Sequence, residues 1–411
     1  MEGIMEIIAG GVTAAKGFMA AGTAAGIKYR DRKDMAMVRS QVPCRAAGVF
    51  TRNVVKAAPV IWDREIVSQK GPVYAVVVNA GIANACTGQQ GYEACSATAA
   101  AAAGALGVGE REVLVCSTGV IGMQLPLDRI SEGAKELAGL VRCGQEAGLE
   151  AAESIMTTDT VPKEAAVRVK IGGKTVTVGG MCKGSGMIHP DMCTMLAFVT
   201  TDADISAELL QEALSCVVVD TFNMVSVDGD TSTNDTLLVL ANGCAQNEPI
   251  REKNADYEAF AAALSQVCTA LAKKIAGDGE GATALFEAKV TGADTKEHAR
   301  TLAKSVITSS LTKAAIFGHD ANWGRILCAL GYAGVSFDPE KIELYLESGA
   351  GSILIYRNGS AADYSEEEAT KILSCPEVTA RVDMKMGSEE ATAWGCDLTY
   401  DYVKINADYR S

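Results

Sequence analysis

The amino-acid sequence predicts a mixed α/β protein of the α+β type, built from layers of helix and sheet. Short, continuously apolar runs indicate buried strands, and longer segments with apolar residues three and four positions apart indicate helices. The two kinds of segment do not alternate strictly along the chain, which argues against a doubly wound parallel sheet. At 411 residues the chain is long enough for two domains or one large two-layer domain, and no repeat or linker marks a boundary.

Strands are predicted where a short run is continuously apolar or alternates between apolar and polar residues. Residues 10–60 are strand-like and punctuated by glycine, and residues 166–178 alternate around Gly172 and Gly173, which predicts a hairpin. Residues 195–199 are continuously apolar and predict a buried strand. The remaining predicted strands are residues 73–78, 113–116, 236–240, 353–356, 379–384 and 393–405.

Helices are predicted where apolar residues recur at helical spacing behind a residue that suits a helix start. Pro126 and Asp128 open one helix, and Ser206 caps another. A long helix over residues 257–276 ends at Gly277. The other predicted helices are an alanine-rich helix after a loop at residues 79–84, and helices at residues 296–309, 322–331 and 366–373.

Composition and charge exclude several classes of protein. The chain is 48% apolar and has a formal net charge of −14, with Lys and Arg scattered singly, so it offers no basic face to a nucleic-acid backbone. No segment reaches the roughly 18–20 strongly apolar residues of a membrane span. The N-terminus lacks the basic and apolar regions of a secretion signal. We therefore expect a cytoplasmic protein that binds neither nucleic acid nor membrane.

The cysteines and histidines indicate reduced thiols and no structural metal. The thirteen cysteines are odd in number and form no C-x-x-C motif. Because Cys116, Cys216, Cys268 and Cys328 lie in apolar stretches, we expect buried reduced thiols and no disulfide framework. The three histidines lie near no suitable cysteine pair, so a zinc site is not expected.

Residues 183–202 join an irregular loop to an apolar strand, and Thr194 stands at the junction. An internal threonine is a poor nucleophile, because its hydroxyl has no adjacent base. If the Cys193–Thr194 peptide bond were cut, the new α-amine, with a reference pKa of about 7.7–8, would serve as base for that hydroxyl. The hydroxyl could itself make the cut by attacking the Cys193 carbonyl. The alternative is an ordinary β-branched residue entering a strand.

Other polar or glycine-containing segments could also carry chemistry. Thr118 and Gly119 follow a predicted strand, where backbone N–H groups and the Thr118 hydroxyl would face an oxyanion, although a plain turn is the alternative. Residues 228–235 are rich in oxygen ligands but lack the glycine and glutamate of a calcium loop, which favours a polar turn. Residues 277–281 fit a helix C-cap better than a dinucleotide fingerprint, and Lys183 belongs to no phosphate loop.

The segment over residues 183–202 resembles the self-processing segment of the ornithine acetyltransferase family, enzymes of the arginine pathway. The resemblance covers nearly the whole chain and includes the run Ser226-Val-Asp-Gly-Asp-Thr-Ser-Thr-Asn-Asp235. Its separate motifs occur in order at residues 11–18, 48–53, 57–60, 117–122, 156–163, 226–235, 278–283, 316–325 and 406–411.

The resemblance implies a layered helix–sheet–sheet–helix fold of the N-terminal-nucleophile kind and a precursor that cleaves itself. The cut would fall between Cys193 and Thr194, giving an α chain of residues 1–193 and a β chain of residues 194–411. The family commonly has alanine before the threonine, and Cys193 keeps a small residue there. An α2β2 assembly of the two chains is implied by the same analogy.

Position by position, the resemblance assigns roles to the residues of the site. Thr194 is the nucleophile for cleavage and for acetyl transfer, and Thr118 with Gly119 stabilises the oxyanion. A cationic Lys183 suits a substrate carboxylate, and Glu280 suits an ammonium group. The implied substrate-binding residues are Thr157, Lys183, Thr194, Glu280, Asn406 and Ser411, the last standing where the family usually has threonine.

The implied reaction is a ping-pong transfer of the acetyl group from N2-acetyl-L-ornithine to L-glutamate through an acetyl-threonine. It needs no metal or nicotinamide cofactor, and the sequence leaves open whether acetyl-CoA is also a donor. Two rival functions remain. One is a self-processing aminopeptidase or amidohydrolase that releases product to water, and the other is an unprocessed binding protein.

Overall fold

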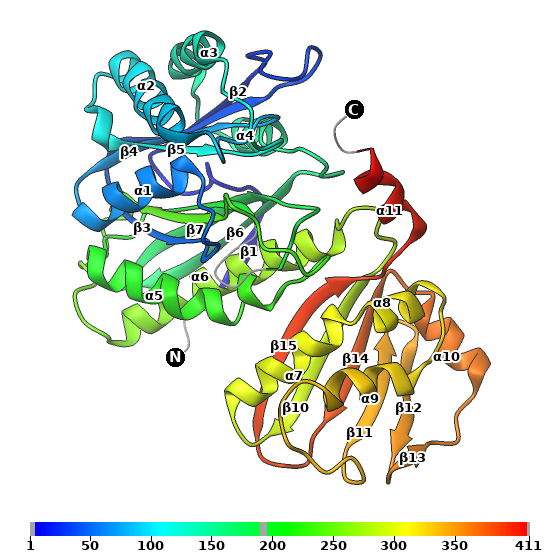
Figure 1. Ribbon diagram of the computed structural model, residues 1–411. Coiled ribbons are helices and arrows are strands. Elements are labelled where there is room, and N and C mark those ends of the chain that lie inside the picture. Colours follow the sequence, from blue (N-terminus) through cyan, green and yellow to red (C-terminus); the bar gives the residue numbers. More distant parts are fainter. Residues whose placement is uncertain (1–4, 190–194, 409–411) are drawn as a thin grey trace. The chain divides into compact units, whose positions relative to one another are not determined.

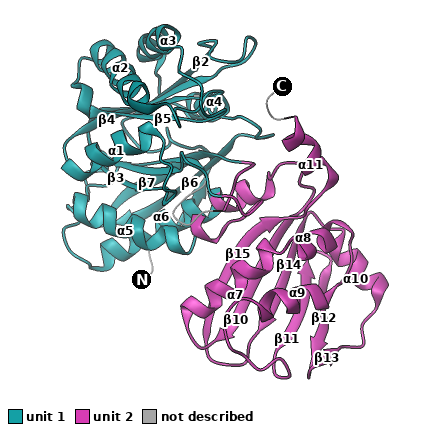
Figure 2. Ribbon diagram, in the orientation of Figure 1, with its two compact units in different colours: residues 1–184, 191–221, 231–271 teal, residues 185–190, 222–230, 272–411 magenta. Residues whose placement is uncertain are grey.

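The computed structural model describes residues 5–189 and 195–408, which form two compact units (Figure 2). Unit 1 comprises residues 1–184, 191–221 and 231–271, and unit 2 comprises residues 185–190, 222–230 and 272–411, within the described ranges. Each unit combines a sheet with helices, which confirms the predicted mixed α/β class. The two units do not follow the predicted α and β chains, whose boundary stays a prediction.

The described part of unit 1 holds a nine-stranded sheet. Its strands are β1 (Glu6–Ile8), β2 (Phe18–Thr23), β3 (Met35–Phe50), β4 (Val73–Asn79), β5 (Val113–Ser117), β6 (Lys163–Ile171), β7 (Lys174–Lys183), β8 (Leu196–Thr201) and β9 (Thr236–Ala241). Their order is β1-β6-β7-β8-β9-β3-β4-β5, with β2 also paired to β3. The long β3 joins two parts of this sheet, because its first residues pair with β2 and β4 and its last with β9.

Helices cover unit 1 on both sides, in the predicted helix–sheet–sheet–helix order (Figure 1). They are α1 (Ala58–Gln69), α2 (Gly88–Leu106), the one-turn η1 (Glu110–Glu112), α3 (Leu127–Leu140), α4 (Gln145–Ser154), α5 (Ala207–Val219) and α6 (Ala255–Gly277), whose last residues count with unit 2. In Figure 1, α2 and α3 lie over the β2–β5 part, and α5 and α6 lie on the side of the β6–β9 part. One hydrophobic core unites both parts, with Val76 and Leu114 from one and Met181 and Leu238 from the other.

The described part of unit 2 holds a six-stranded sheet in the order β13-β12-β11-β14-β10-β15. These strands are β10 (Leu285–Ala293), β11 (Glu343–Ser348), β12 (Gly351–Arg357), β13 (Ser360–Ala361), β14 (Glu377–Asp383) and β15 (Glu389–Cys396). The helices are the one-turn η2 (Phe222–Met224), α7 (Lys296–Thr308), α8 (Ser310–Phe317), α9 (Trp323–Gly331), α10 (Glu366–Leu373) and α11 (Tyr400–Ala407). Burial alternates along β14, where Val378, Ala380 and Val382 are buried, so one face of the sheet packs against helices.

Two predicted strands are wrong at one end. Residues 58–60 were assigned to the strand-like region but form the first turn of α1, where Pro59 occupies a position that a helix start tolerates. Residues 393–405 were predicted as one strand, yet β15 ends at Cys396 and residues 400–407 form α11. No residue of α11 is buried, so this helix packs no apolar face into a core.

The cysteine prediction is confirmed for some thiols and wrong for others. Cys116 and Cys268 are buried, and burial raises the pKa of both thiols. Cys216 and Cys328 are exposed, because they occupy the outer faces of α5 and α9. Among the described residues, no group of three or more His, Cys, Asp or Glu is placed to hold a metal ion. Every helix within residues 5–189 and 195–408 is too short or too polar to cross a lipid bilayer.

The edge strand β5 is protected by side chains of α1. The indole Nε1 of Trp62 donates to the Val113 carbonyl at 3.2 Å, and the Val115 N–H donates to the Asp63 carboxyl at 2.9 Å. These bonds occupy backbone groups that an edge strand would otherwise present to another chain. Asp63 is fully buried, and the Cys116 thiol donates to its second oxygen at 3.4 Å.

Replacing Asp63 with asparagine is expected to make the stability less dependent on pH. Burial raises the pKa of the Asp63 carboxyl from 3.8 to about 8, so the folded chain keeps a proton that the unfolded chain releases. Folding stability therefore falls as pH rises through this window, by up to about 1.4 kcal/mol per pH unit. Asp63→Asn keeps an acceptor for Val115 and has no such proton. As pH rises from about 5 to about 8, the unfolding midpoint of wild type should fall relative to that of the variant. A difference between the two midpoints that stays constant over this range would contradict the prediction.

Candidate active site

The loop that contains Thr118 and Gly119 is fixed at the ends of two parallel strands in unit 1. β4 and β5 run side by side, and the loops that follow them are bonded together. The Thr118 N–H donates to the Asn79 carbonyl at 3.0 Å, and the Val120 N–H donates to the Gly81 carbonyl at 3.1 Å. Gly119 between them has φ +128°, and a Cβ there would lie 2.3 Å from the backbone of Gly81. Only glycine fits this position.

Replacing Gly119 with alanine is expected to lower the acetyl transfer that the resemblance implies by about a hundredfold, because a shift of about 1 Å in this loop displaces the Thr118 backbone and hydroxyl. Gly122→Ala is the matched control, since Gly122 has φ +79° but nothing lies within 4 Å of an added Cβ. Both substitutions strain the backbone, but only the one at Gly119 also brings a Cβ against Gly81, so the difference between the two variants measures the effect of that clash. Measured rates that fall equally in both variants would show that the close approach to Gly81 has no special importance.

Lys183 brings three of the predicted site residues together. It is the last residue of β7, and its Nζ donates to the Thr157 hydroxyl at 2.9 Å and to the Thr118 hydroxyl at 3.2 Å. Lys183 and Thr118 are buried, with 9% and 8% of their surface exposed. A buried cation beside two hydroxyl groups is suited to hold a carboxylate or a developing oxyanion. This cluster is therefore the strongest candidate for a reaction centre in unit 1.

Asp159 supports this cluster and was not predicted to have a role. Its carboxylate accepts from the Thr157 N–H at 3.1 Å, the Gly184 N–H at 2.6 Å and the Lys163 Nζ at 2.7 Å. Burial would raise its pKa, but the charges of Lys183 and Lys163 and these hydrogen bonds outweigh burial and lower it to about 2. Asp159 is thus ionised at neutral pH and orients the backbone beside two predicted substrate-binding residues.

Asn234 fastens the strand end that precedes Thr118. Its side-chain amide donates to the Ser117 carbonyl at 3.0 Å, and the hydroxyl of Ser117 accepts from the Asn84 N–H at 2.8 Å. Asn234 belongs to the segment over residues 228–235, for which a polar turn was predicted. The segment does turn, and its side chains bind distant backbone groups. Sequence spacing could not reveal this, because Asn234 and Ser117 are 117 positions apart.

Unit 2 brings Glu280 and Asn406 together. The Asn406 amide donates to the Glu280 carboxylate at 2.8 Å, and the Glu280 N–H donates to the Ser185 carbonyl at 2.9 Å. Glu280 is buried, with 6% of its surface exposed, so it is not an exposed residue of the turn after α6. A Cβ added to Gly186 would lie 2.3 Å from the Glu280 carboxyl carbon, so the loop at Gly186 packs directly on this group.

Three predicted site residues lie outside the described residues: Cys193, Thr194 and Ser411. The residue after Thr194 is described, and the Met195 carbonyl accepts from the Thr236 N–H at 2.9 Å. The start of β8 is therefore held by β9 immediately beyond the predicted nucleophile.

Comparisons with known proteins agree with the motifs. Residues 19–411 match the ArgJ family. The chain is 54% identical over 409 residues to the arginine biosynthesis bifunctional protein ArgJ of Symbiobacterium thermophilum, covering 99% of this chain and 100% of that protein. A crystal structure of ArgJ from Bacillus halodurans aligns with 48% identity and a TM-score of 0.49, covering 51% of this chain and 97% of that one. An ornithine acetyltransferase from Mycobacterium tuberculosis, solved in complex with ornithine, aligns with 44% identity and a TM-score of 0.43, covering 47% of this chain and 100% of that one.

The chain is thus an enzyme of arginine biosynthesis, and it belongs to the ArgJ family. Within that pathway it is an ornithine acetyltransferase, as the motifs implied.

Proposed function

We propose that the enzyme transfers acetyl groups from N2-acetyl-L-ornithine to L-glutamate by a ping-pong mechanism with Thr194 as nucleophile. The observation that supports this most directly is the Lys183 cluster, in which one buried ammonium group binds the hydroxyls of Thr118 and Thr157. Such preorganised donors favour the charge that develops on a carbonyl oxygen under attack.

In the first step the Thr194 hydroxyl attacks the acetyl carbonyl, and its proton passes to the α-amine of Thr194. The oxyanion is stabilised at Thr118 and Gly119. The amide C–N bond then breaks, the ornithine nitrogen takes the proton, and ornithine leaves an acetyl ester on Thr194. In the second step the amine of glutamate attacks this ester, and N-acetylglutamate leaves as the threonine hydroxyl is restored.

The substrates are recognised by opposite charges. Lys183 binds the substrate carboxylate together with Thr157, and Glu280 binds the side-chain ammonium group of ornithine. Asn406, whose amide already donates to the Glu280 carboxylate, orients that group. Ser411 completes the substrate-binding residues with its hydroxyl.

Self-cleavage between Cys193 and Thr194 generates the amine that the mechanism needs, and it gives chains of residues 1–193 and 194–411. The sheet of unit 1 supports this proposal, because β7 before the cut and β8 after it are antiparallel neighbours, with Lys183 opposite Leu196. The ladder between them does not require the bond that is cut, so the chains remain associated. We propose an α2β2 assembly of these chains.

Acetyl-CoA serves as a second acetyl donor to Thr194, as the word bifunctional in the name of the Symbiobacterium thermophilum relative suggests. The reaction uses no metal and no nicotinamide cofactor, since the threonine amine and hydroxyl supply base and nucleophile. The enzyme works in the cytoplasm on small molecules, without nucleic acid or membrane.

The test is the intact mass of the denatured protein, with and without N2-acetylornithine. Two chains that separate at Cys193 and Thr194, with one acetyl group on the β chain, are the expected result. A single uncut chain without an adduct would overturn the proposal in favour of a binding protein. Ornithine release that does not depend on glutamate, with acetate as the product, would identify the hydrolase instead.

A further inference from the structure

The Asp159 carboxylate joins two distant chain segments at the Lys183 cluster of unit 1. One of its oxygens accepts from the Gly184 N–H at 2.6 Å and from the Lys163 Nζ at 2.7 Å, and the other accepts from the Thr157 N–H at 3.1 Å. Gly184 directly follows Lys183, whose Nζ donates to the Thr157 hydroxyl at 2.9 Å. One carboxylate therefore binds the backbone on both sides of the contact between Lys183 and Thr157.

Both of these backbone positions depend on side chains, because neither lies in a helix or a strand. β7 ends at Lys183, so Gly184 lies beyond the strand, and Thr157 lies between the end of α4 and the start of β6. The Arg32 guanidinium also reaches the Thr157 carbonyl, but at 3.5 Å, which is longer than the usual range of about 2.7–3.2 Å. Hydrogen bonds to a carboxylate are stronger than those between neutral groups. Asp159 is therefore the stronger restraint on the spacing of the two segments.

The carboxylate keeps a fixed place because its ion pair is buried. The side chains of Asp159 and Lys163 are both fully buried. Burial alone would raise the pKa of Asp159, but the charges of Lys183 and Lys163 help to lower it to about 2, so the carboxylate is ionised at neutral pH. An apolar pair of similar size often gives at least as much stability as a buried ion pair. The pair is thus better suited to fix a position than to add stability.

We propose that Asp159 is a positioning residue that sets the preference of the enzyme for an acetyl donor with a free carboxylate. The inference rests on the proposed function, because it presumes that Lys183 and Thr157 bind that carboxylate. A carboxylate offers Lys183 a full charge, whereas a carboxamide of the same shape offers only a carbonyl dipole. The enzyme gains from this difference when the ammonium group and the Thr157 hydroxyl are held at the spacing of a carboxylate. Asp159 fixes that spacing by binding the amides of Thr157 and Gly184.

The test compares two acetyl donors, N2-acetyl-L-ornithine and its α-carboxamide, in the full-length enzyme. The measured quantity is the ratio of kcat/KM for the acid to kcat/KM for the amide. In a ping-pong reaction, kcat/KM for the donor reports only the donor steps, so the carboxylate of glutamate does not enter. The ratio is also independent of the folded fraction, because both donors are measured on one preparation. A purely structural role of Asp159 would lower both constants and leave their ratio unchanged.

Replacing Asp159 with asparagine is expected to lower this ratio about tenfold. Asparagine has one acceptor oxygen, so it binds the amide of Thr157 or that of Gly184 but not both, and the spacing between the two segments changes. The double variant Asp159→Asn with Lys163→Met removes both charges of the ion pair, which spares the fold an uncompensated buried charge. Its ratio should fall by the same factor.

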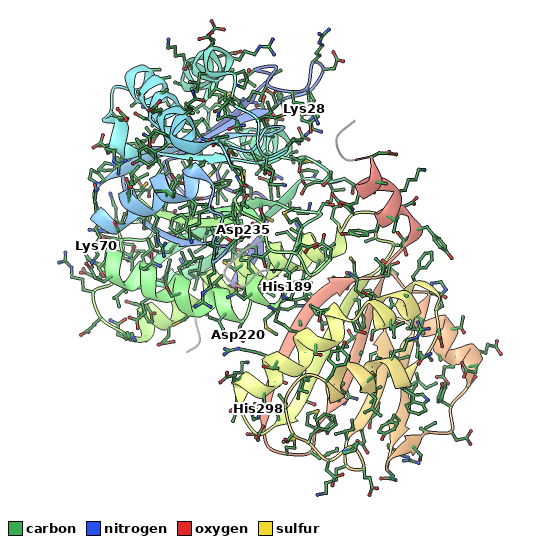
Figure 3. The ribbon with its side chains drawn as sticks, in the orientation of Figure 1. Lys28, Lys70, His189, Asp220, Asp235 and His298 are labelled. Atoms are coloured by element: carbon green, nitrogen blue, oxygen red, sulfur yellow. The ribbon has the colours of Figure 1, made fainter. Side chains whose placement is uncertain are left out.

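Glu208→Gln is the matched control. Glu208 forms an ion pair with Lys70, labelled in Figure 3, and its length of 2.7 Å equals that of the Asp159–Lys163 pair. Both side chains of this control pair are exposed, and exposed ion pairs contribute little. The ratio in Glu208→Gln should therefore equal that of wild type.

A ratio that stays at the wild-type value in Asp159→Asn and in the double variant would overturn the inference, even if the rates fall. A ratio that falls in Asp159→Asn but recovers in the double variant would also overturn it, because the loss would then come from the charge of Lys163. A wild-type enzyme that uses both donors equally would exclude Lys183 as the carboxylate-binding group, and the inference with it. A wild-type chain that releases no ornithine from N2-acetylornithine would instead overturn the proposed function.

Discussion

Replacing Thr194 with alanine is expected to leave one uncut chain with acetyl transfer reduced by at least about a thousandfold. The variant loses the hydroxyl that attacks both the Cys193 carbonyl and the acetyl group, and without the cut no α-amine is released to act as base. Gel electrophoresis and intact mass report the cut, and ornithine release in the presence of glutamate reports transfer.

Thr194→Ser is the matched control for this experiment. It keeps the hydroxyl and, once cut, the α-amine, so it should be cleaved and should retain part of the transfer activity. The sheet gives no reason for either variant to unfold, since β8 begins at Leu196 and is held by β7 and β9. A cleaved or active Thr194→Ala protein would exclude Thr194 as the nucleophile.

Much of the fold could be predicted from the sequence, because apolar spacing reports burial directly. The hairpin of β6 and β7 turns at Gly172 and Gly173, both at positive φ, and α10 has the bounds that were predicted. Prediction failed where burial gives no periodic signal, as in α11, which has no buried residue. It also missed α8, which begins directly after α7 with Ser309 capping both helices.

The candidate site was predicted only in part, because its contacts join residues far apart in the sequence. Lys183 and Thr118 meet at 3.2 Å although they are 65 positions apart, and only the resemblance to a family grouped them. Asp159 and Lys163 form a fully buried ion pair four positions apart and outside any helix, a pattern that no spacing rule identifies. Asp228 stood in a correctly predicted polar turn, but its partners at residues 187 and 188 could be found only in the folded chain.

Replacing Lys183 with methionine is expected to reduce kcat/KM for N2-acetylornithine by about a hundredfold. The variant keeps a side chain of similar length but removes a cation that binds two hydroxyls, Thr118 and Thr157. Hydrogen bonds to charged groups are worth about 1.5–3 kcal/mol each, so the loss of one substrate contact and of one oriented hydroxyl makes a hundredfold the lower end of the expected range. The Asp159–Lys163 pair remains in place, which keeps the Asp159 carboxylate paired.

Lys170→Met is the matched control, because Lys170 is an exposed lysine on β6, the strand that neighbours β7. Its kcat/KM should equal that of wild type. Lys183→Arg should not restore activity. A guanidinium group is larger than an ammonium group and planar, so it would not fit between the hydroxyls of Thr118 and Thr157. The kinetic constants of Lys183→Met separate two roles of the lysine. If Lys183 binds the substrate carboxylate equally in the ground and transition states, KM rises in the variant while kcat changes little. If Lys183 also orients Thr118 at the oxyanion, kcat falls as well. The hydrogen bond to Thr118 leads us to expect both changes, and an unaltered kcat/KM in Lys183→Met would remove Lys183 from the mechanism.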